Sequence, residues 1–333
     1  MRTLRRVSWS RLVPLVVAAC FSADPEDPGD GGGGGCSGGA RGALDQGSFS
    51  TVDCPTGVTL PGEASCLEHL AVAAGARARL RFAADDWEAV ITGASSTAPG
   101  VVRIDAVVTD PEHPTAEIDL TALAAGAAVV QVDAATGPID QLSIRVEPVA
   151  AVTLTVPRKI AVGGTVAVGG SVTNTRGEAL IGRGAFTLTA GEGLVITPAP
   201  LGTPGLLLGR GPDYAIRATA PGDHLLTTTP ATTGALRMTA IAAAALRDIR
   251  MSASPFQLEA VRGDAWAAVV VGATDDVGDA VVGIPCEWRA SRPVWFEPLA
   301  PHADAVIVRS PLATPVEVTC LIEGTPRATV TIR

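Results

Sequence analysis

The chain has 333 residues, a formal net charge of −9, and 47 % hydrophobic but only 4 % aromatic residues. This acidic balance argues against nucleic acid and anionic lipid headgroups as partners, because both require basic patches that displace counterions. A core with so few rings must consist mostly of Val, Leu, Ile and Ala, which suits thin β-modules, and the length suits two or three domains of ~100 residues.

The chain begins with the pattern of an export signal. A short apolar stretch, Leu12 to Ala19, follows a group of basic residues and is too short to span a bilayer, which takes ~20 residues. Residues 1–19 are therefore predicted to be a signal peptide. The basic residues are Arg2, Arg5, Arg6 and Arg11.

The end of this segment, Val17-Ala18-Ala19-Cys20, resembles the lipobox of bacterial lipoproteins. The resemblance implies that Cys20 becomes the mature N-terminus and carries lipid such as palmitate, which holds a soluble body on a membrane. Phe21 is not the Asp that retains some lipoproteins in the inner membrane, so the outer membrane of a Gram-negative bacterium is favoured. An ordinary signal peptide with an incidental cysteine is the alternative. Loss of residues 1–19 leaves 21 basic against 34 acidic residues, a formal charge of −13.

Residues 20–47 are rich in Gly, Asp, Pro and Ser and contain few apolar residues. Such a segment cannot bury enough surface to offset its ordering entropy. We predict a disordered tether between the lipid and the folded part.

Export to an oxidising compartment permits disulfides. With Cys20 lipidated, an odd number of cysteines remains, and the pairs that stay within one domain are Cys54 with Cys66 and Cys286 with Cys320. Cys36 is left over, as a free thiol, an intermolecular bridge or an inconsequential cysteine.

The middle and the end of the chain contain a repeat. The segments TNTRGEALIG (173–182) and TDDVGDAVVG (274–283) match at an offset of 101 residues, about one domain length, which indicates a duplicated module. Alternating strands flank both copies, and AVAAGARARLRF (71–82) is a weaker version of the same opening. We expect domains at 48–148, 149–247 and 248–333.

This order of strands, Gly-containing turns and a closing hairpin resembles the bacterial immunoglobulin-like domains, group 2, and the related invasin and intimin repeats. The resemblance covers roughly residues 150–333 with fair specificity and residues 50–148 only weakly. It implies an all-β fold of tandem immunoglobulin-like β-sandwiches. Cys286 falls in the expected third strand, two residues before Trp288, so a bond to Cys320 would join strands of one sheet, unlike the bridge of antibody domains.

Catalytic and metal-binding motifs are scarce in the sequence. The four histidines lie in different segments, and no zinc motif, nucleophile elbow or phosphate-binding loop occurs. Two acidic segments fit either calcium ligands or solvated turns, and the turn is the favoured interpretation. ADDW (84–87) offers a carboxylate pair without a cleft. The two acidic segments contain Asp275, Asp276 and Asp279, and Asp110 and Glu112.

We therefore expect that the protein is not an enzyme and has neither a cofactor nor a metal. We expect a membrane-anchored stalk or adhesin-like protein that faces the cell surface or periplasm and has a protein or polysaccharide ligand. An exported polymer-degrading hydrolase and a subunit of an envelope assembly are the alternatives. Trp288, Trp295 and Phe296 lie close together in a Pro-rich segment. We expect Trp288 and Phe296 in the core and Trp295 exposed, where it is available for partner binding.

Overall fold

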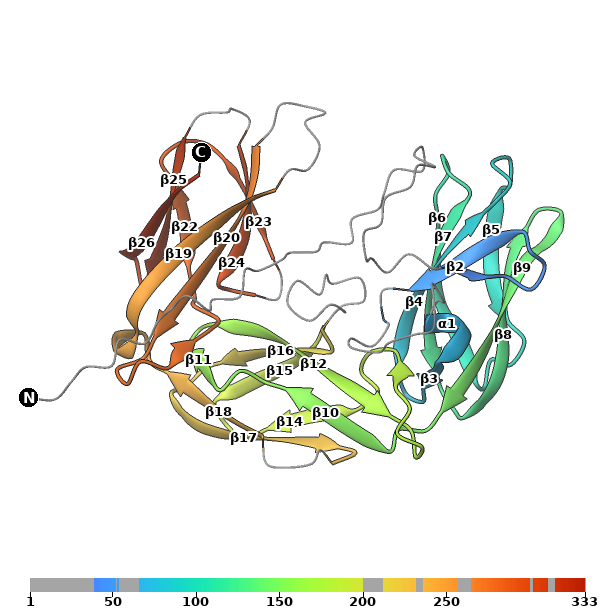
Figure 1. Cartoon of the computed structure of the whole chain (residues 1–333), viewed down its shortest axis with the longest axis horizontal. Coiled ribbons are helices and arrows are strands. Elements are labelled where there is room, and N and C mark those ends of the chain that lie inside the picture. Colours follow the sequence, from blue (N-terminus) through green and yellow to red (C-terminus); the bar gives the residue numbers. More distant parts are fainter. Residues whose placement is uncertain are drawn as a thin grey trace, which may run out of the picture.

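The computed structural model describes residues 39–51, 53, 66–199, 212–231, 236–256, 265–299, 302–310 and 315–332. In these residues the chain is almost entirely β-strand, with one short α-helix, α1 (Cys66–His69), and one 3-10 turn, η1 (Ala243–Ala245). The strands form six sheets, which pair into three successive sandwiches that we call units 1, 2 and 3. Units 1 and 3 rise from the same side of unit 2 (Figure 1).

Unit 1 has one sheet in the order β1-β2-β4-β7-β6 and a second in the order β3-β9-β8-β5. Its strands are β1 (Ala40–Arg41), β2 (Gly47–Thr51), β3 (Ala71–Ala73), β4 (Arg77–Ala84), β5 (Ile91–Ser96), β6 (Val102–Thr109), β7 (Thr115–Ala122), β8 (Gly126–Ala134) and β9 (Gly137–Glu147).

Unit 2 has sheets in the orders β10-β12-β16-β15 and β11-β18-β17-β14. Its strands are β10 (Ala151–Thr155), β11 (Lys159–Ala161), β12 (Thr165–Thr173), β13 (Leu180–Ile181), β14 (Thr187–Ala190), β15 (Leu194–Pro198), β16 (Tyr214–Ala218), β17 (Gly222–Thr229) and β18 (Leu236–Ile241). The two-residue strand β13 pairs with neither of these sheets but with β3 of unit 1.

Unit 3 has sheets in the orders β19-β20-β24-β23 and β22-β25-β26, and β21 pairs with β20. Its strands are β19 (Arg247–Phe256), β20 (Ala265–Thr274), β21 (Ala280–Val281), β22 (Glu287–Ala290), β23 (Trp295–Pro298), β24 (Ala305–Ser310), β25 (Val316–Ile322) and β26 (Thr325–Ile332). The closing hairpin β25–β26 turns at Glu323 and Gly324, as the sequence predicts.

All three units share the immunoglobulin-like strand order. In this topology the first, second, fifth and fourth strands make one sheet and the third, sixth and seventh make the other. Unit 3 follows it with β19-β20-β24-β23 and β22-β25-β26. Units 1 and 2 add a short strand, β3 or β11, parallel to the last strand, and unit 1 also adds β1 beside β2. The predicted fold, all-β with tandem immunoglobulin-like sandwiches, is confirmed.

The cores consist of the alternating apolar residues of facing sheets. In β12 every second residue is buried, and β4 shows the same alternation. Because successive side chains of a strand point to opposite faces, this pattern places one face of each sheet inside the sandwich. Aromatic contacts in the cores are few. The ring centroids of Phe49 and Phe82 lie 4.8 Å apart in unit 1, and those of Phe186 and Tyr214 lie 5.4 Å apart in unit 2.

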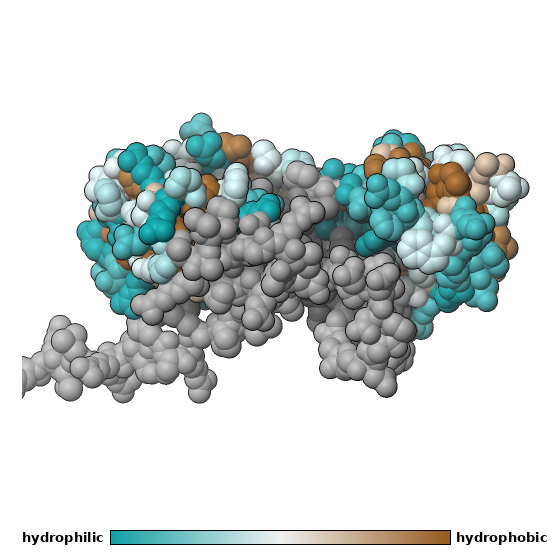
Figure 2. Space-filling view, turned by 90° about the horizontal axis from the view of Figure 1, so that it is seen from above, coloured by the Kyte–Doolittle hydropathy of each residue, from teal (hydrophilic) through white to brown (hydrophobic). Residues whose placement is uncertain are grey.

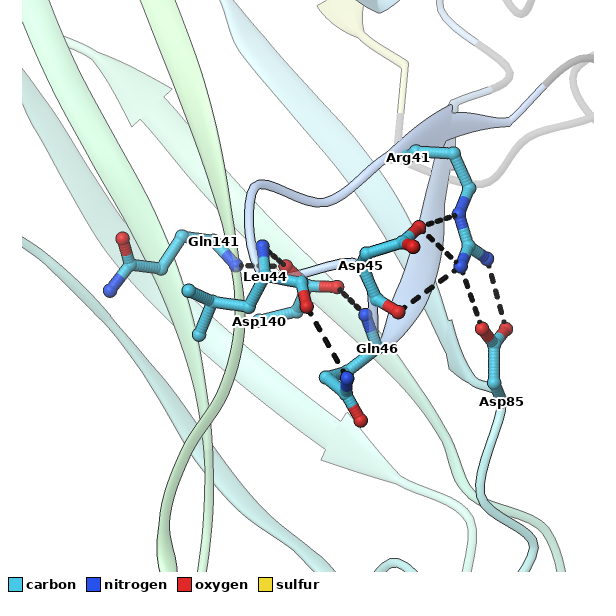
Figure 3. Close-up of polar contacts among 7 residues, drawn as sticks. All are labelled: Arg41, Leu44, Asp45, Gln46, Asp85, Asp140 and Gln141. Atoms are coloured by element: carbon cyan, nitrogen blue, oxygen red, sulfur yellow. Dashed lines mark hydrogen bonds and ion pairs between the residues drawn. The ribbon is translucent and has the colours of Figure 1, made fainter.

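Residues 40–47, assigned to the tether by their composition, belong to unit 1 instead. Ala40 is fully buried and pairs with Phe49 across the β1–β2 hairpin. The buried carboxylate of Asp140, at the other end of the unit's sequence, accepts N–H groups of Leu44 and Gln46 at 2.8 and 2.9 Å (Figure 3). A distant acceptor therefore satisfies the polar backbone of this turn, which local composition cannot reveal.

The sheets change between Glu147 and Ala151 and between Ile241 and Arg247. These positions lie beside the predicted domain boundaries at 148/149 and 247/248. Independent folding of the segments 48–148, 149–247 and 248–333 stays a prediction.

Candidate interaction sites and inter-unit junctions

Several of the cysteines singled out in the sequence lie outside the described residues. These are Cys20, Cys36 and Cys54. Cys66 is disulfide-bonded, but the predicted pairing with Cys54 stays a prediction. The bond between Cys286 and Cys320 is confirmed, with Cα atoms 5.1 Å apart. It joins the residue just before β22 to β25, and these two strands pair within one sheet, as predicted from the expected strand of Cys286.

The three aromatic residues of the Pro-rich segment divide as expected. Trp288 and Phe296 are partly buried against the core of unit 3. Trp295 has 61 % of its surface exposed at the start of β23, which ends its sheet among the described strands. The guanidinium carbon of Arg309, on the neighbouring strand β24, lies 5.7 Å from the Trp295 ring centroid. This cation–π contact orients an exposed indole, while partner binding by Trp295 stays a prediction.

The repeated sequence motif forms the same hairpin in units 2 and 3, which we call the docking hairpin (residues 173–183 and 274–284). In unit 2, the side chain of Asn174 accepts the N–H groups of Arg176 and Glu178 at 2.9 and 3.0 Å. In unit 3, Asp275 accepts those of Val277 and Asp279 at 3.2 and 2.9 Å. The first polar residue after the repeated Thr therefore fixes the turn in each copy.

Each docking hairpin extends a sheet of the preceding unit. Strand β13 of unit 2 pairs in parallel with β3 of unit 1, with Leu180 opposite Ala71 and Ile181 opposite Val72. Val282 of unit 3 bonds to β11 of unit 2 in the same way: its carbonyl accepts the Ala161 N–H at 3.0 Å. The paired aliphatic residues of the motif are thus strand residues of an inter-unit sheet, and this role was not foreseen from the sequence.

Glycine permits the close approach at the second junction. A Cβ atom on Gly164 would lie 1.5 Å from the carbonyl oxygen of Gly283. Gly283 itself has a φ of 67°, in the left-handed region that favours glycine. Gly283, the last residue of the repeated motif, and Gly164 of unit 2 therefore pack directly against each other.

A buried ion pair closes the first junction. The guanidinium of Arg183, in unit 2, contacts the carboxylate of Asp53, in unit 1, and the two residues are only 2 % and 0 % exposed. Asp53 also accepts the Arg79 N–H at 2.9 Å. At the same junction, Glu147 Oε2 of unit 1 accepts a hydrogen bond from the side-chain amide of Asn174 at 2.6 Å. A buried carboxylate needs such partners, because desolvation is otherwise costly.

An acidic cluster closes the second junction. The ammonium group of Lys159, the only lysine of the chain, contacts Asp275 and lies 2.8 Å from Asp279 Oδ2. Lys159 holds the pKa of Asp275 below its usual value, and Asp275 in turn raises the pKa of Lys159. The segment is the exposed turn that we favoured, and in addition Asp275 and Asp279 are partners of a cation from the preceding unit.

A second buried carboxylate lies beside this junction. Asp304 Oδ2 accepts the Gly283 N–H at 2.6 Å, and the neighbouring Ala303 donates its N–H to the Thr165 carbonyl of unit 2 at 3.1 Å. Burial raises the pKa of Asp304 and lowers that of His302, whose Nδ1 lies 3.9 Å from Asp304 Oδ1. The loop before β24 thus braces the docking hairpin against unit 2.

The structure brings together two further segments that the sequence singled out, ADDW (84–87) and the acidic segment TDPEHP (109–114) that contains Asp110 and Glu112. Trp87, in the β4–β5 loop, and His113, in the β6–β7 loop, have ring centroids 6.1 Å apart. His113 Nδ1 lies 3.0 Å from Asp110 Oδ2. Two acidic loops that are separate in the sequence therefore meet through Trp87 and His113 at one end of unit 1.

Among the described residues, no three His, Cys, Asp or Glu side chains are placed to hold a metal ion. No helix within the described part of the chain is long and apolar enough to cross a membrane.

No family model and no curated protein sequence matches the chain. Similar solved structures include the FdeC adhesin of Escherichia coli, with 13 % identity, a TM-score of 0.25, and 78 % of this chain and 93 % of that chain covered. Domains 4–9 of the surface layer protein SbsC have 12 % identity, a TM-score of 0.28, and coverage of 86 % and 47 %. Invasin, a bacterial integrin-binding protein, has 14 % identity, a TM-score of 0.22, and coverage of 87 % and 59 %. The immunoglobulin-like assignment rests on the strand orders of the chain's own sheets.

Proposed function

We propose that the protein is a lipid-anchored, non-enzymatic binding or structural protein of the cell envelope, which holds its sandwiches as a stalk or an adhesin-like array. The observation that carries this proposal is the pair of inter-unit junctions. At each one a docking hairpin adds strand residues to the preceding sheet, and ion-paired side chains stand beside the added strand.

Such junctions favour a spacer or display role over a set of loosely joined modules. Interfaces between domains of one chain commonly allow relative motion unless they are large and well packed. Here one continuous cluster of buried apolar residues includes side chains of both unit 1 and unit 2, such as Val72 and Ile181. A rigid array keeps a binding surface at a fixed distance from its attachment point.

The anchor in this proposal is Cys20, and its support is the sequence alone. The Val17-Ala18-Ala19-Cys20 pattern after an Arg-rich start favours lipidation, and Phe21 favours the outer membrane. Cys20→Ser in the full-length chain should abolish incorporation of labelled palmitate and release the protein from the membrane fraction. Cys36→Ser is the matched control and should keep both. Unchanged labelling and fractionation of Cys20→Ser would remove the anchor from the proposal.

The binding surface in this proposal is the edge of unit 3 around Trp295. Exposed Trp residues supply large contact areas and are enriched in binding hot spots, and the Arg309 contact reduces the entropy that this side chain loses on binding. The partner is a protein or polysaccharide of the envelope or of another cell. In a crosslinking pull-down with the full-length protein, Trp295→Ala should weaken capture of the partner by about tenfold. Phe296→Leu, a change on the buried side of the same strand, should leave capture intact; equal capture by wild type and Trp295→Ala would refute the surface.

A further inference from the structure

One end of unit 1 corresponds to the ends that units 2 and 3 use for docking. We call it the head end of unit 1 and define it by the β4–β5 loop (85–90) and the β6–β7 loop (110–114). In units 2 and 3 the equivalent loops carry the docking hairpin and, in unit 3, the Ala303 contact with unit 2. The same surface of the fold therefore binds a protein neighbour twice within this chain.

The β4–β5 loop begins with the same turn as the docking hairpins. Asp86 Oδ1 accepts the Glu88 N–H at 2.9 Å, and its carbonyl accepts the Ala89 N–H at 3.1 Å. Asn174 and Asp275 make the equivalent two bonds in units 2 and 3. After this turn, the aliphatic pair of unit 1 is Val90 and Ile91, and Ile91 already begins β5, so unit 1 has no separate docking strand between the turn and β5.

The head end has exposed apolar side chains where units 2 and 3 have their docking strand. Trp87 is 66 % and Val90 is 69 % exposed. Figure 2 looks onto this side of the molecule and shows hydrophobic residues of unit 1 beside hydrophilic ones. The indole of Trp87 is placed by its tilted contact with the ring of His113, and His113 is held by Asp110. A large, oriented and uncovered indole is typical of a binding hot spot rather than of a sandwich core.

The charge of the head end selects the chemistry of its partner. The two loops contain five carboxylates and neither lysine nor arginine. One of the carboxylates, Asp85, is neutralised by Arg41 at 2.8 Å. The surplus of negative charge around an exposed Trp favours a cation, because the indole face and the carboxylates attract it together. The carboxylates are those of Asp85, Asp86, Glu88, Asp110 and Glu112.

We propose that the head end of unit 1 is a second interaction surface, separate from Trp295, which binds a protein segment that presents Arg or Lys side chains. One cationic side chain lies over Trp87, the carboxylates of Glu88 and Glu112 flank it, and Val90 contacts its apolar stem or a neighbouring residue. This surface requires neither the lipid anchor nor the Trp295 site.

The test is peptide binding to the full mature chain carrying Cys20→Ser, measured by fluorescence anisotropy at physiological ionic strength. The probe is a labelled peptide of alternating Arg and Ser, and the matched probe has citrulline, which is uncharged, in place of Arg. We expect the Arg peptide to bind and the citrulline peptide to bind at least about tenfold more weakly, since charge and cation–π attraction are lost together.

Two pairs of variants separate this surface from the general acidity of the protein. Trp87→Ala should weaken binding of the Arg peptide about tenfold, whereas Trp295→Ala, which removes an equally exposed indole from unit 3, should not change it. Glu88→Gln with Glu112→Gln should weaken binding, whereas Glu192→Gln with Glu317→Gln, which removes the same charge elsewhere, should have little effect.

The proposal is overturned if Trp87→Ala binds as tightly as wild type while its circular dichroism and thermal unfolding are unchanged. It is also overturned if the two charge-matched double variants lose equal affinity, or if a neutral oligosaccharide such as cellohexaose binds at Trp87 and the Arg peptide does not.

Discussion

Arg183 of unit 2 and Asp53 of unit 1 form an ion pair across 130 residues of sequence, and both side chains are buried. At the equivalent place in unit 3, one repeat length later, stands the buried apolar residue Ile284. The two junctions thus share their backbone pairing and differ in the side chain that fills this position.

Breaking this ion pair from one side should be costly, because the remaining charge is buried without its partner. Arg183→Met is expected to lower the free energy of unfolding of the full-length chain by about 3–5 kcal/mol. The double variant Asp53→Asn with Arg183→Met should recover part of that loss. Urea unfolding of the single and double variants gives the coupling energy, and a sum of independent effects would show that the two side chains do not interact.

The second junction should fail when Gly164 acquires a side chain. Its Cβ atom would overlap the Gly283 carbonyl oxygen at 1.5 Å, so the docking hairpin must move. We expect Gly164→Ala to destabilise the chain by about 1–3 kcal/mol in urea unfolding, as overpacking does. Gly191→Ala is the control, because no heavy atom lies within 4 Å of its Cβ position. Equal stability of the two variants would contradict the packing at this junction.

Removal of the Asp140 carboxylate should release the β1–β2 turn. Asp140→Ala leaves the N–H groups of Leu44, Gln46 and Gln141 without their acceptor, and we expect a loss of about 3 kcal/mol. Cleavage by a protease within residues 40–47 should become faster. Asp85→Ala, which breaks an exposed ion pair with Arg41, should change the stability little, because solvent screens such a pair. Slow cleavage of Asp140→Ala would show that the turn holds without this carboxylate.

Acid should weaken the docking hairpin of unit 2. Arg176, and then Asn174, lower the pKa of Glu178 in the docking hairpin to about 2. A free glutamate ionises near ~4.3, so the stability contributed by ionised Glu178 is complete above roughly pH 5 and is lost as the pH falls toward 2. Urea unfolding at a series of pH values should show a smaller loss on acidification for Glu178→Gln than for wild type. If the stability of wild type and of Glu178→Gln falls in parallel with pH, the low pKa assigned to Glu178 is wrong.

The sequence predicted the class of fold well because the signals of a β-sandwich are local. Alternating strands such as β12, the closing hairpin and the 101-residue repeat all lie within short windows. Strand order followed from the resemblance of these windows to immunoglobulin-like repeats. The exposure of Trp295 was predictable for a similar reason, since prolines surround it and Phe296 alternates with it on the same strand.

The junctions could not be predicted because their partners are far apart in the chain. The aliphatic pair of the motif was part of an expected turn, and only the pairing of Leu180 with Ala71 shows it to be a strand of the preceding sheet. Likewise Asp275 was assigned from its neighbours in sequence, whereas its partner, Lys159, precedes it by 116 residues. The single lysine of the chain was the one available signal.

The interlocking of the units, on which the proposed spacer role rests, is tested most directly by hydrogen–deuterium exchange of the inter-unit amides in the wild-type protein. These are the N–H groups of Arg77, Arg183, Ala161, Val282 and Ala303, each of which donates to a carbonyl of the neighbouring unit. Interlocked units predict protection as strong as that of amides inside the sandwiches, such as Ile216 in the β12–β16–β15 sheet. Exchange of the inter-unit amides at the rate of exposed loops, while Ile216 stays protected, would show that the units move independently and would contradict the account.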